Sequence, residues 1–424
     1  MNKSRLEPLG VPGSQLDYDA DAGARSQDDT PNALDRWVLS KLTSVIDPAR
    51  LRIVLWDQPV PGRTDEVPAV QIGDRAALYR VVRYPELHFG DLYSTGRIGV
   101  YGDLLKVLEE CYRYTAEHAT AAKWIGRFQR LAAAPSLADS QRNIHHHYDI
   151  GNDFYRLWLD REALQYTCAY YASPDMTIEE SQRAKMHHVC RKLRLRPGET
   201  VAEAGSGWGG FALFMAEQYG VRVKSFNISK EQIAFARDWA KQRRLDHLVE
   251  FVEDDFRNIQ GTYDAFVSIG MLEHAGAGNY RPLGALIQRV LTPNGRGLIH
   301  SIGRDRSARL NPWIEKRIFP GAHPPTLREM MDIFEPNNLS VLDIENIRLH
   351  YAKTLAAWQQ RYEENIEAVR EMFDETFVRG WRLYLAGSQM AFVRGSLQLF
   401  QVLFTRSGMN EIPDTRAHVY TETQ

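Results

Sequence analysis

The chain has 424 residues, of which 44% are hydrophobic and 25% are charged, as in an ordinary globular protein that needs no metal or disulfide to fold. Its 52 basic and 54 acidic residues give a net charge of −2, which argues against a nucleic-acid binder that relies on phosphate contacts. The three cysteines, Cys111, Cys168 and Cys190, are too few and too scattered for a disulfide framework or a cysteine-rich zinc site, so we expect a reducing compartment.

The composition divides the chain into four parts. We predict a disordered tail at 1–33, which is polar and has no signal-peptide core, and a smaller N-terminal α+β domain at 34–130. A linker at 131–142, rich in Ala, Pro and Ser at its start, leads to a larger domain at 143–424. The longest apolar run, Trp381–Phe404, is interrupted by polar and charged residues, so any membrane contact is expected to be peripheral.

Hydrophobic periodicity predicts the elements of both domains. In the N-terminal domain it favours, in chain order, a helix, two strands and a helix, at Leu34–Ile46, Arg52–Trp56, Ala77–Arg83 and Tyr101–Ala116. In the larger domain, helical segments alternate with five apolar runs, at Glu199–Ser206, Val221–Ser229, Leu248–Asp254, Tyr263–Met271 and Gly295–Gly303. This alternation predicts an α/β fold with a mostly parallel sheet and helices on both faces. Two later runs, Ser340–Ile347 and Leu397–Arg406, complete the sheet after a helical insertion within Thr354–Ala391.

A glycine-rich turn follows the first of these strands. Gly205, Gly207 and Gly210 satisfy the G-x-G-x-x-G pattern, in which bare backbone at the carboxyl end of a strand accommodates a nucleotide. A dinucleotide fold usually has Asp or Glu at the end of its second strand, where this chain has Asn227. The motif therefore favours S-adenosylmethionine over NAD, and an NAD oxidoreductase is the less favoured alternative.

Polar residues at the ends of the next two strands are candidates for the same site. Asn227 and Gln232 lie just beyond the second strand, and Ser229 with Gln232 has the spacing of a helix capping box. Asp254, Asp255 and Phe256 follow the third strand, where a carboxylate is suited to accept from an adenine amino group and an aromatic ring to stack on it. Solvated loop acids and a purely structural cap are equally consistent with these patterns.

Two candidates for chemistry stand at the ends of the fourth and fifth strands. Glu273 follows one strand and His300 ends the next, so both are expected at the ligand-binding edge of the sheet. Cys168, by itself, is typical of a small buried hydrophobic residue. The run His145-His146-His147 cannot converge on one ion, and we predict no metal site.

Beyond these local patterns, the chain resembles the cyclopropane-fatty-acyl-phospholipid synthases and the related mycolic-acid methyltransferases. The resemblance spans about Asn143 to Arg406 and lies in motifs that occur in family order: His147–Tyr155, Gln165–Tyr170, Gly205–Gly210, Ile228–Gln232, Gly270–Gly276, Leu298–Gly303, Asn311–Ile314, Tyr351 with Thr354-Leu355, and Gln401–Arg406. The segment Phe89-Gly90-Asp91 resembles the smaller lipid-associated domain of bacterial members.

The resemblance implies a Rossmann-like class I methyltransferase that uses S-adenosylmethionine on an unsaturated acyl chain of a membrane phospholipid. It also implies a bicarbonate ion held by Cys168, Glu273, His300 and Tyr351. The implied cofactor residues, together with those proposed above, are Tyr148, Tyr166, Thr167, Glu203, Gly205, Ser206, Gly207, Asn227, Ser229, Gln232, Asp254, Asp255 and Phe256. The family further implies a cytoplasmic enzyme at the inner face of the membrane, and a homodimer.

Three residues depart from the family pattern, and they bear on the product. Glu203, Ser206 and Asn227 stand where Asp, Cys and Thr are common. In the implied reaction the alkene attacks the sulfonium methyl, and bicarbonate then removes a proton so that a cyclopropane ring closes. Loss of a proton from the neighbouring chain carbon instead gives a methylene- or methyl-branched chain, so a fatty-acyl C-methyltransferase remains an alternative. A lipid-binding or regulatory protein without catalysis is a third, which the presence of all four anion-site residues disfavours.

Overall fold

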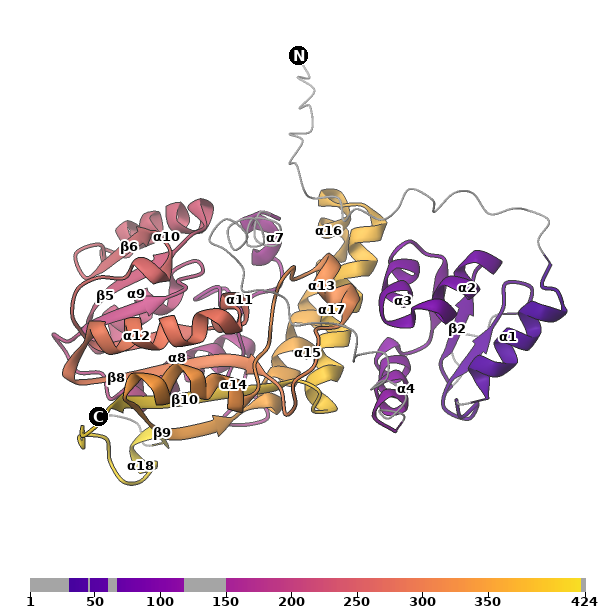
Figure 1. The fold of residues 1–424 in the computed structure, drawn as a ribbon. Coiled ribbons are helices and arrows are strands. Elements are labelled where there is room, and N and C mark those ends of the chain that lie inside the picture. Colours follow the sequence, from indigo (N-terminus) through magenta and orange to yellow (C-terminus); the bar gives the residue numbers. More distant parts are fainter. Residues whose placement is uncertain (1–29, 45, 60–66, 118–149, 421–424) are drawn as a thin grey trace, which may run out of the picture.

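The computed structural model describes residues 30–44, 46–59, 67–117 and 150–420. The predicted linker, nearly all of the predicted tail and Tyr148 lie outside these ranges. Figure 1 shows a large sheet with its helices at one end of the molecule and the N-terminal elements at the other, with long helices between them. Within the described ranges, no helix combines the length and the apolar character that crossing a membrane requires.

The N-terminal elements form a small sheet with its own core. The strands pair in the order β1 (Arg52–Val54), β2 (Ala69–Ile72) and β3 (Ile98–Tyr101), with β1 parallel and β3 antiparallel to β2. The accompanying helices are α1 (Ala33–Thr43), α2 (Arg75–Arg83), α3 (Pro85–Ser94) and α4 (Leu104–Glu117). Their buried side chains include Leu55, Ile72, Leu78, Ile98 and Val107.

The predicted strand at Ala77–Arg83 is wrong, because this segment is helix α2. Asp74 caps the helix, its side chain accepting from the backbone N–H of Ala77 at 2.8 Å. Burial of Ala77 and Leu78, with Val81 packed against the same core, gives the segment one apolar helical face. The cap and this face outweigh the strand propensity of the valines. The helices predicted at either end of the domain are confirmed as α1 and α4.

The larger sheet has seven strands in the order β6-β5-β4-β7-β8-β10-β9. Neighbouring strands from β6 to β8 are parallel, and β10 runs antiparallel to both β8 and β9. All seven predicted strands of this domain are confirmed, at β4 (Thr200–Ala204), β5 (Arg222–Asn227), β6 (Val249–Glu253), β7 (Tyr263–Ile269), β8 (Leu291–Gly303), β9 (Leu339–Asn346) and β10 (Gln398–Arg406).

Helices cover both faces of this sheet, as the alternation of elements predicts. Val201 packs with one set of helices and the next residue, Ala202, with the other, because successive strand residues face opposite sides. The first face carries α8 (Ile178–Leu193), α9 (Gly210–Tyr219) and α10 (Lys230–Gln242). The second carries α11 (Leu272–Ala275), α12 (Tyr280–Val290) and α14 (Leu327–Phe334). The remaining elements are α7 (Asn152–Arg156), η1 (Phe256–Asn258), η2 (Ala277–Asn279), α13 (Pro312–Arg317), η3 (Glu335–Asn337) and α18 (Ala417–Tyr420).

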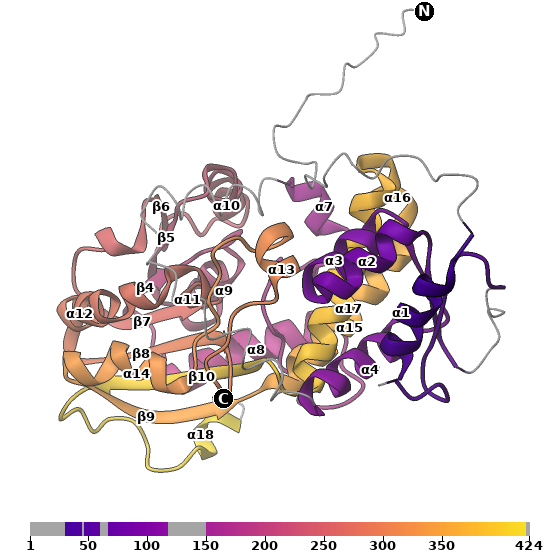
Figure 2. The same cartoon turned by 45° about the vertical axis from the view of Figure 1, so that its right-hand side comes forward.

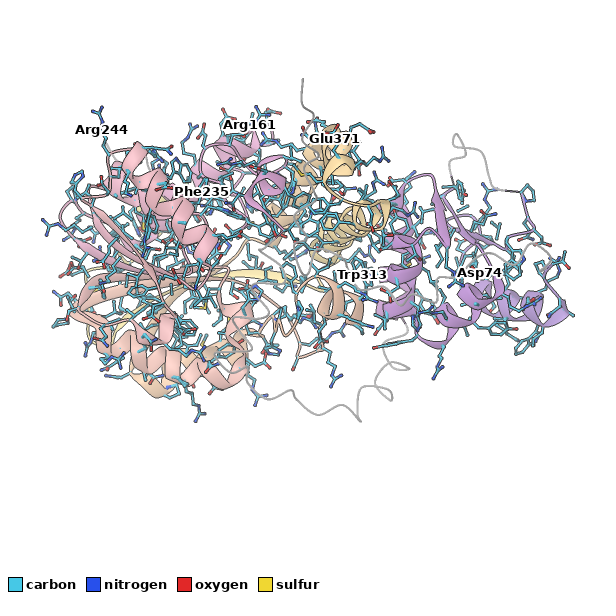
Figure 3. The ribbon with its side chains drawn as sticks, turned by 90° about the horizontal axis from the view of Figure 1, so that it is seen from above. Asp74, Arg161, Phe235, Arg244, Trp313 and Glu371 are labelled. Carbon is cyan, nitrogen blue, oxygen red and sulfur yellow. The ribbon has the colours of Figure 1, made fainter. Side chains whose placement is uncertain are left out.

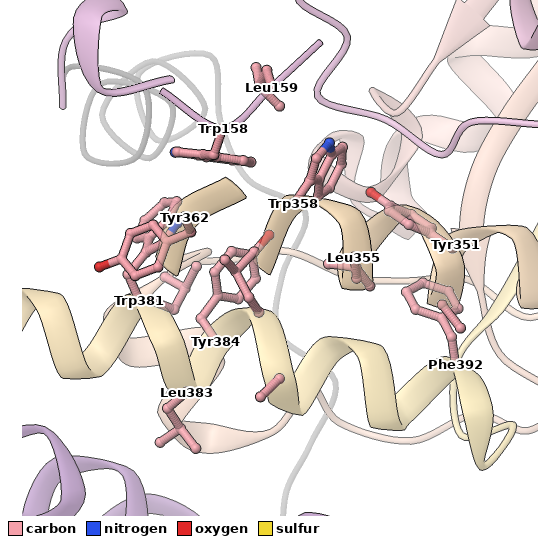
Figure 4. Close-up of a cluster of buried hydrophobic side chains, with 14 of the residues drawn as sticks. Trp158, Leu159, Tyr351, Leu355, Trp358, Tyr362, Trp381, Leu383, Tyr384 and Phe392 are labelled. Atoms are coloured by element: carbon pink, nitrogen blue, oxygen red, sulfur yellow. The ribbon is translucent and has the colours of Figure 1, made fainter. Parts of the chain in front are cut away.

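The predicted helical insertion is α15 (Arg348–Glu364), α16 (Ile366–Met372) and α17 (Glu375–Val393). α15 and α17 pack against each other around an aromatic cluster, and α17 also packs on α3 and α4 of the N-terminal part (Figure 2). The cluster contains Trp158, Trp358 and Trp381, each at most 2% exposed (Figure 4). Tyr93 from α3 and Leu108 from α4 join the same cluster, so it ties the N-terminal part to the insertion.

A second contact joins α3 to α13, at two motifs that carry the family resemblance. A Cβ added at Gly90 would lie 2.5 Å from the Trp313 ring, so only glycine allows this approach. Asp91 accepts two hydrogen bonds from Arg317, both at 3.0 Å, and both side chains are buried. Figure 3 shows Trp313 at the boundary between the N-terminal helices and the rest of the chain.

Candidate functional site

A pocket opens at the carboxyl ends of the parallel strands, beside the glycine turn that leads from β4 to α9. Gly205 has φ +94°, a conformation that side chains rarely adopt. A Cβ at Gly210 would lie 2.0 Å from the carbonyl oxygen of Ala163, so the helix start is packed directly against another backbone segment. The turn therefore presents bare backbone to the pocket, as its sequence predicts.

The structure brings most of the predicted cofactor residues into this pocket. They line it as a group: Tyr166, Thr167, Glu203, Gly205, Ser206, Gly207, Asn227, Gln232, Asp254, Asp255 and Phe256. Ser229 is not among the lining residues. It caps α10, its hydroxyl accepting from the backbone N–H of Gln232 at 3.4 Å, so the structural reading of that motif applies to it. That the lining residues bind a cofactor stays a prediction at this point.

Other lining residues were not singled out from the sequence as cofactor residues. They include Leu164, Gln165, Trp208, Phe226, Met271 and His274. Trp208 lies inside the glycine motif, and His274 directly follows Glu273. Both therefore stand just after a predicted strand, and this position is a sequence signal that indicates a place at the ligand-binding edge of the sheet. Gln165 had only the family motif as a signal.

Glu203 is a buried acid at the end of β4, 2% exposed. The hydroxyl of Ser225 donates to its Oε2 at 2.5 Å. Burial raises the pKa of Glu203 to about 7, against the opposing effects of this hydrogen bond and the charge of Lys185. A ligand cation placed beside this carboxylate would favour its ionised form.

An amide pair holds the turn and leaves one donor free. Asn227 donates from Nδ2 to the carbonyl oxygen of Gly207 at 3.2 Å and to Oε1 of Gln232 at 2.8 Å. Nε2 of Gln232 is buried, and no residue in the described part of the chain is hydrogen-bonded to it. Because Gln232 lines the pocket, this amide is placed to donate to a ligand.

The acidic pair after β6 is already engaged by its neighbours. Asp254 accepts from the backbone N–H of Asp255 and from Asn258, each at 2.7 Å. Asp255 is bonded to the guanidinium of Arg257 at 2.7 and 3.0 Å. Phe256 begins η1 between them. The arrangement fixes both carboxylates and the ring at the rim of the pocket.

Cys168 and Tyr351, predicted from the family alone, both belong to the aromatic cluster. Thr354 links their segments, because its hydroxyl accepts from the backbone N–H of Ala169 at 3.0 Å and it stands one turn after Tyr351 on α15. Burial raises the pKa of the Cys168 thiol far above its usual value, which favours the thiol over the thiolate. The Tyr351 ring stacks on Phe392, with ring centroids 4.5 Å apart (Figure 4).

Glu273 is hydrogen-bonded to the end of β8, the strand that carries His300. Oε1 of Glu273 accepts from the backbone N–H of Ile302 at 2.5 Å, two residues beyond His300 on the strand. Burial raises the pKa of Glu273 to about 7 and lowers that of His300 well below its usual value. Nδ1 of His300 accepts from the Gln401 amide at 3.1 Å, so the neutral ring carries its proton on Nε2. Oε2 of Glu273 and Nε2 of His300 are both buried and have no hydrogen-bond partner among the described residues.

One close contact connects the segment that carries Cys168 with the segment that carries Glu273. A Cβ added at Gly270, three residues before Glu273, would lie 2.9 Å from the Thr167 side chain, which directly precedes Cys168. The segments that carry Cys168 and Glu273 are therefore packed against each other beside the pocket. None of the four predicted catalytic residues is among the residues that line the pocket.

Comparisons with known proteins agree with this geometry. The family model for mycolic acid cyclopropane synthetase matches residues 136–402. A probable fatty acid methyltransferase of Pseudomonas putida is 32% identical over 385 residues, which cover 87% of this chain and 96% of that protein. The cyclopropane-fatty-acyl-phospholipid synthase of Escherichia coli K12 is 37% identical over 266 residues, 62% of this chain and 68% of that one. The crystal structure of mycolic acid cyclopropane synthase CmaA1 complexed with SAH and CTAB matches 63% of this chain and 98% of that chain, with 28% identity and a TM-score of 0.60.

The fold and these relatives define a methyltransferase that uses S-adenosylmethionine and modifies a lipid. The match of the family model over more than half of the chain makes the assignment more specific. The chain belongs to the mycolic acid cyclopropane synthetase family.

Proposed function

We propose that the enzyme is a cyclopropane fatty acid synthase that transfers a methylene group from S-adenosylmethionine to the double bond of an unsaturated phospholipid acyl chain. The observation that carries this proposal is the pair of unpartnered buried atoms at the end of β8, Oε2 of Glu273 and Nε2 of His300. A carbocation reaction needs negative charge and a proton acceptor in a site that excludes water. The pair stands beside the proposed cofactor pocket: Glu273 would supply the negative charge, and the two atoms together would hold the proton acceptor.

In this proposal the same two atoms would hold bicarbonate. The carboxylate Oε2 of Glu273 would accept from the hydroxyl of the ion, and Nε2–H of His300 would donate to one of its oxygens. When bound, bicarbonate would supply the base for the proton that leaves the new methyl group. Cys168, Thr354 and Tyr351 would close the opposite wall of this site.

In the proposed reaction the cofactor transfers the methyl group to the substrate, and the protein stabilises the positive charge that results. The alkene attacks the sulfonium methyl, the carbon–sulfur bond breaks, and a positive charge develops on the neighbouring chain carbon while S-adenosylhomocysteine leaves. Glu273 would stabilise that charge from a poorly solvated position, and neutral His300 would hold the proton acceptor without adding positive charge. Loss of a proton from the new methyl group then lets the second carbon–carbon bond close the ring.

A second product is favoured by the relative that covers most of both chains. That relative, from Pseudomonas putida, is described as a probable fatty acid methyltransferase and matches 87% of this chain. The alternative proposal is therefore a C-methyltransferase that uses the same substrate and cofactor. In that case a hydride shifts from the methyl-bearing carbon to the cationic carbon, and the methyl group then loses a proton to the base, which leaves a methylene branch. Direct loss of a proton from the methyl-bearing chain carbon would instead leave a methyl-branched alkene.

The product decides between these proposals. The enzyme would be incubated with vesicles of unsaturated phospholipid and methyl-labelled S-adenosylmethionine, and the released acyl chains examined by mass spectrometry and proton NMR. A gain of one CH₂ with cyclopropyl signals is expected. Vinylidene signals at the same mass would replace the synthase proposal with the alternative. No mass gain would contradict both.

We also propose that the enzyme contacts the membrane through exposed apolar residues of α1 and α2. Leu34, Trp37 and Val82 are 56%, 57% and 44% exposed there, and Lys41 lies 5.7 Å above the Trp37 ring. Exposed tryptophan beside a basic side chain is suited to the interface of a bilayer. Trp37→Glu should reduce co-sedimentation with anionic phospholipid vesicles, and unchanged co-sedimentation would contradict this assignment.

A further inference from the structure

A fully buried lysine lies directly beneath the cofactor pocket. Lys185 on α8 is 0% exposed, and its Nζ donates to Oε1 of Gln165 and to Oγ1 of Thr167, the latter at 3.1 Å. Both acceptors line the pocket. The reaction described above assigns no role to this lysine.

The same helix also forms hydrogen bonds with the backbone of Gln165 and Thr167. Gln182, one turn before Lys185, donates from Nε2 to the carbonyl oxygens of Thr167 at 2.8 Å and of Gln165 at 3.4 Å. α8 therefore holds Gln165 and Thr167 by main chain and by side chain together. Because Cys168 follows directly, this contact also sets the start of the anion site.

Lys185 is a cation among groups that are acidic or neutral. The groups that act on its charge are Asp160 from the preceding loop, Glu203 from β4, Cys168, and Cys190 on its own helix. Its ammonium in turn lowers the pKa of His300 from across the site, and the Phe211 ring lies 5.9 Å from Nζ. Burial lowers the pKa of Lys185 to about 8, so its charged form still predominates at pH 7.

The described hydrogen-bond acceptors of this ammonium are neutral, and the two carboxylates that act on its charge, Asp160 and Glu203, are not among those acceptors. Gln165 and Thr167 accept as neutral groups, and Asp160 uses its oxygens to accept from the backbone N–H groups of Ala163 and Gln165 at 2.7 and 2.6 Å. A buried charge with neutral partners is costly unless an anion comes close. The amino-acid end of S-adenosylmethionine carries a carboxylate.

We propose that Lys185 is a positioning residue of the cofactor site, which orients Gln165 and Thr167 and supplies the positive charge faced by the carboxylate of bound S-adenosylmethionine. This inference rests on the proposed use of the pocket for that cofactor. It predicts that Lys185 discriminates ligands by their amino-acid end and contributes nothing to recognition of the adenosine end.

The test is calorimetric titration of the full-length enzyme with two probes. S-Adenosylhomocysteine carries the carboxylate, and 5′-methylthioadenosine lacks it. Lys185→Met should weaken S-adenosylhomocysteine binding about 10-fold or more while leaving methylthioadenosine binding unchanged. Lys192→Met is the matched control, because Lys192 is on the same helix, 1% exposed, and paired at 2.6 Å with Glu345 instead. It should leave both affinities unchanged.

Lys185→Gln is a second variant, for the case in which Lys185→Met fails to fold. It keeps a hydrogen-bond donor for Gln165 but carries no charge. The ratio of wild-type to Lys185→Gln affinity for S-adenosylhomocysteine should be large at pH 7 and fall as pH rises above about 8, where the wild-type lysine loses its proton. The ratio cancels the titration of the ligand itself.

Three outcomes would overturn this assignment. They are equal affinities in wild type and both variants, equal weakening of both probes, and an affinity ratio that does not change with pH. Failure of wild type to bind S-adenosylhomocysteine would instead overturn the proposed function, so the two failures are distinguishable.

Discussion

Replacing Glu273 by glutamine is expected to stabilise the folded protein while it disables the reaction. Glu273 is 6% exposed, and its carboxyl group accepts from the backbone N–H of Ile302 at 2.5 Å. Burial raises its pKa from 4.5 to about 7. Glutamine keeps the shape and the acceptor oxygen but cannot ionise, so it removes the cost of burying a charge.

Whether the charge of Glu273 stabilises or destabilises the protein depends on which state, folded or unfolded, binds the proton more tightly. Because the folded pKa is the higher one, a rise in pH through 4.5 ionises the unfolded chain first, and the free energy of unfolding falls until the folded pKa is passed. A tenfold change in proton affinity corresponds to about 1.4 kcal/mol. Glu273→Gln should therefore exceed wild type by less than about 1 kcal/mol at pH 5 and by on the order of 3 kcal/mol at pH 8.

The assay is urea unfolding of both proteins at pH 5 and pH 8, with turnover measured on the same samples. Turnover should fall at least ~100-fold, because the negative charge beside the reacting carbon is lost. Glu345→Gln is the control of opposite sign, since His188 and Lys192 lower the pKa of Glu345 to about 2 and its removal should destabilise the protein at pH 8. The reasoning is refuted if Glu273→Gln is no more stable than wild type at pH 8.

Two further predictions concern the pocket and the contact between the two parts of the chain. Gln232→Leu removes the free buried donor and should weaken S-adenosylmethionine binding about 10-fold by calorimetry, and an unchanged Kd would show that Nε2 does not reach the ligand. Arg317→Met leaves Asp91 buried without its two hydrogen bonds and should cost about 3–5 kcal/mol in urea unfolding. A loss below about 1 kcal/mol would mean that water reaches Asp91 in the native state.

The sequence predicts those site residues that directly follow a predicted strand. The glycine turn, Glu273 and His300 each follow an apolar run, and the carboxyl ends of parallel strands share an edge, so their convergence could be expected. Cys168 and Tyr351 have no such local signal. Their segments meet through the hydroxyl of Thr354, and only the folded insertion brings that residue to the sheet.

Two other features depend on contacts between distant segments, which hydrophobic periodicity does not predict. The segment Ala77–Arg83 has strand-forming valines, but the Asp74 side chain caps it as a helix and its apolar residues share one helical face. Lys185 occupies an ordinary position on an amphipathic helix, and nothing in its own segment indicates that its ammonium reaches Thr167 beneath the pocket. Its partners belong to a segment that precedes the helix in the chain.

The contact of α13 with the N-terminal helices reaches the reacting groups through the chain that follows it. Trp313 is seated on α3, and Phe319, just beyond α13, packs against His274 in the pocket with ring centroids 5.9 Å apart. Four residues later, the backbone N–H of His323 donates to the carbonyl oxygen of Glu273 at 2.7 Å. The backbone that carries the proposed catalytic carboxylate is thus held by a segment whose other end is anchored on the N-terminal part. Because well-packed contacts transmit displacement rather than absorb it, separating α3 from α13 should disturb the site as well as the contact itself.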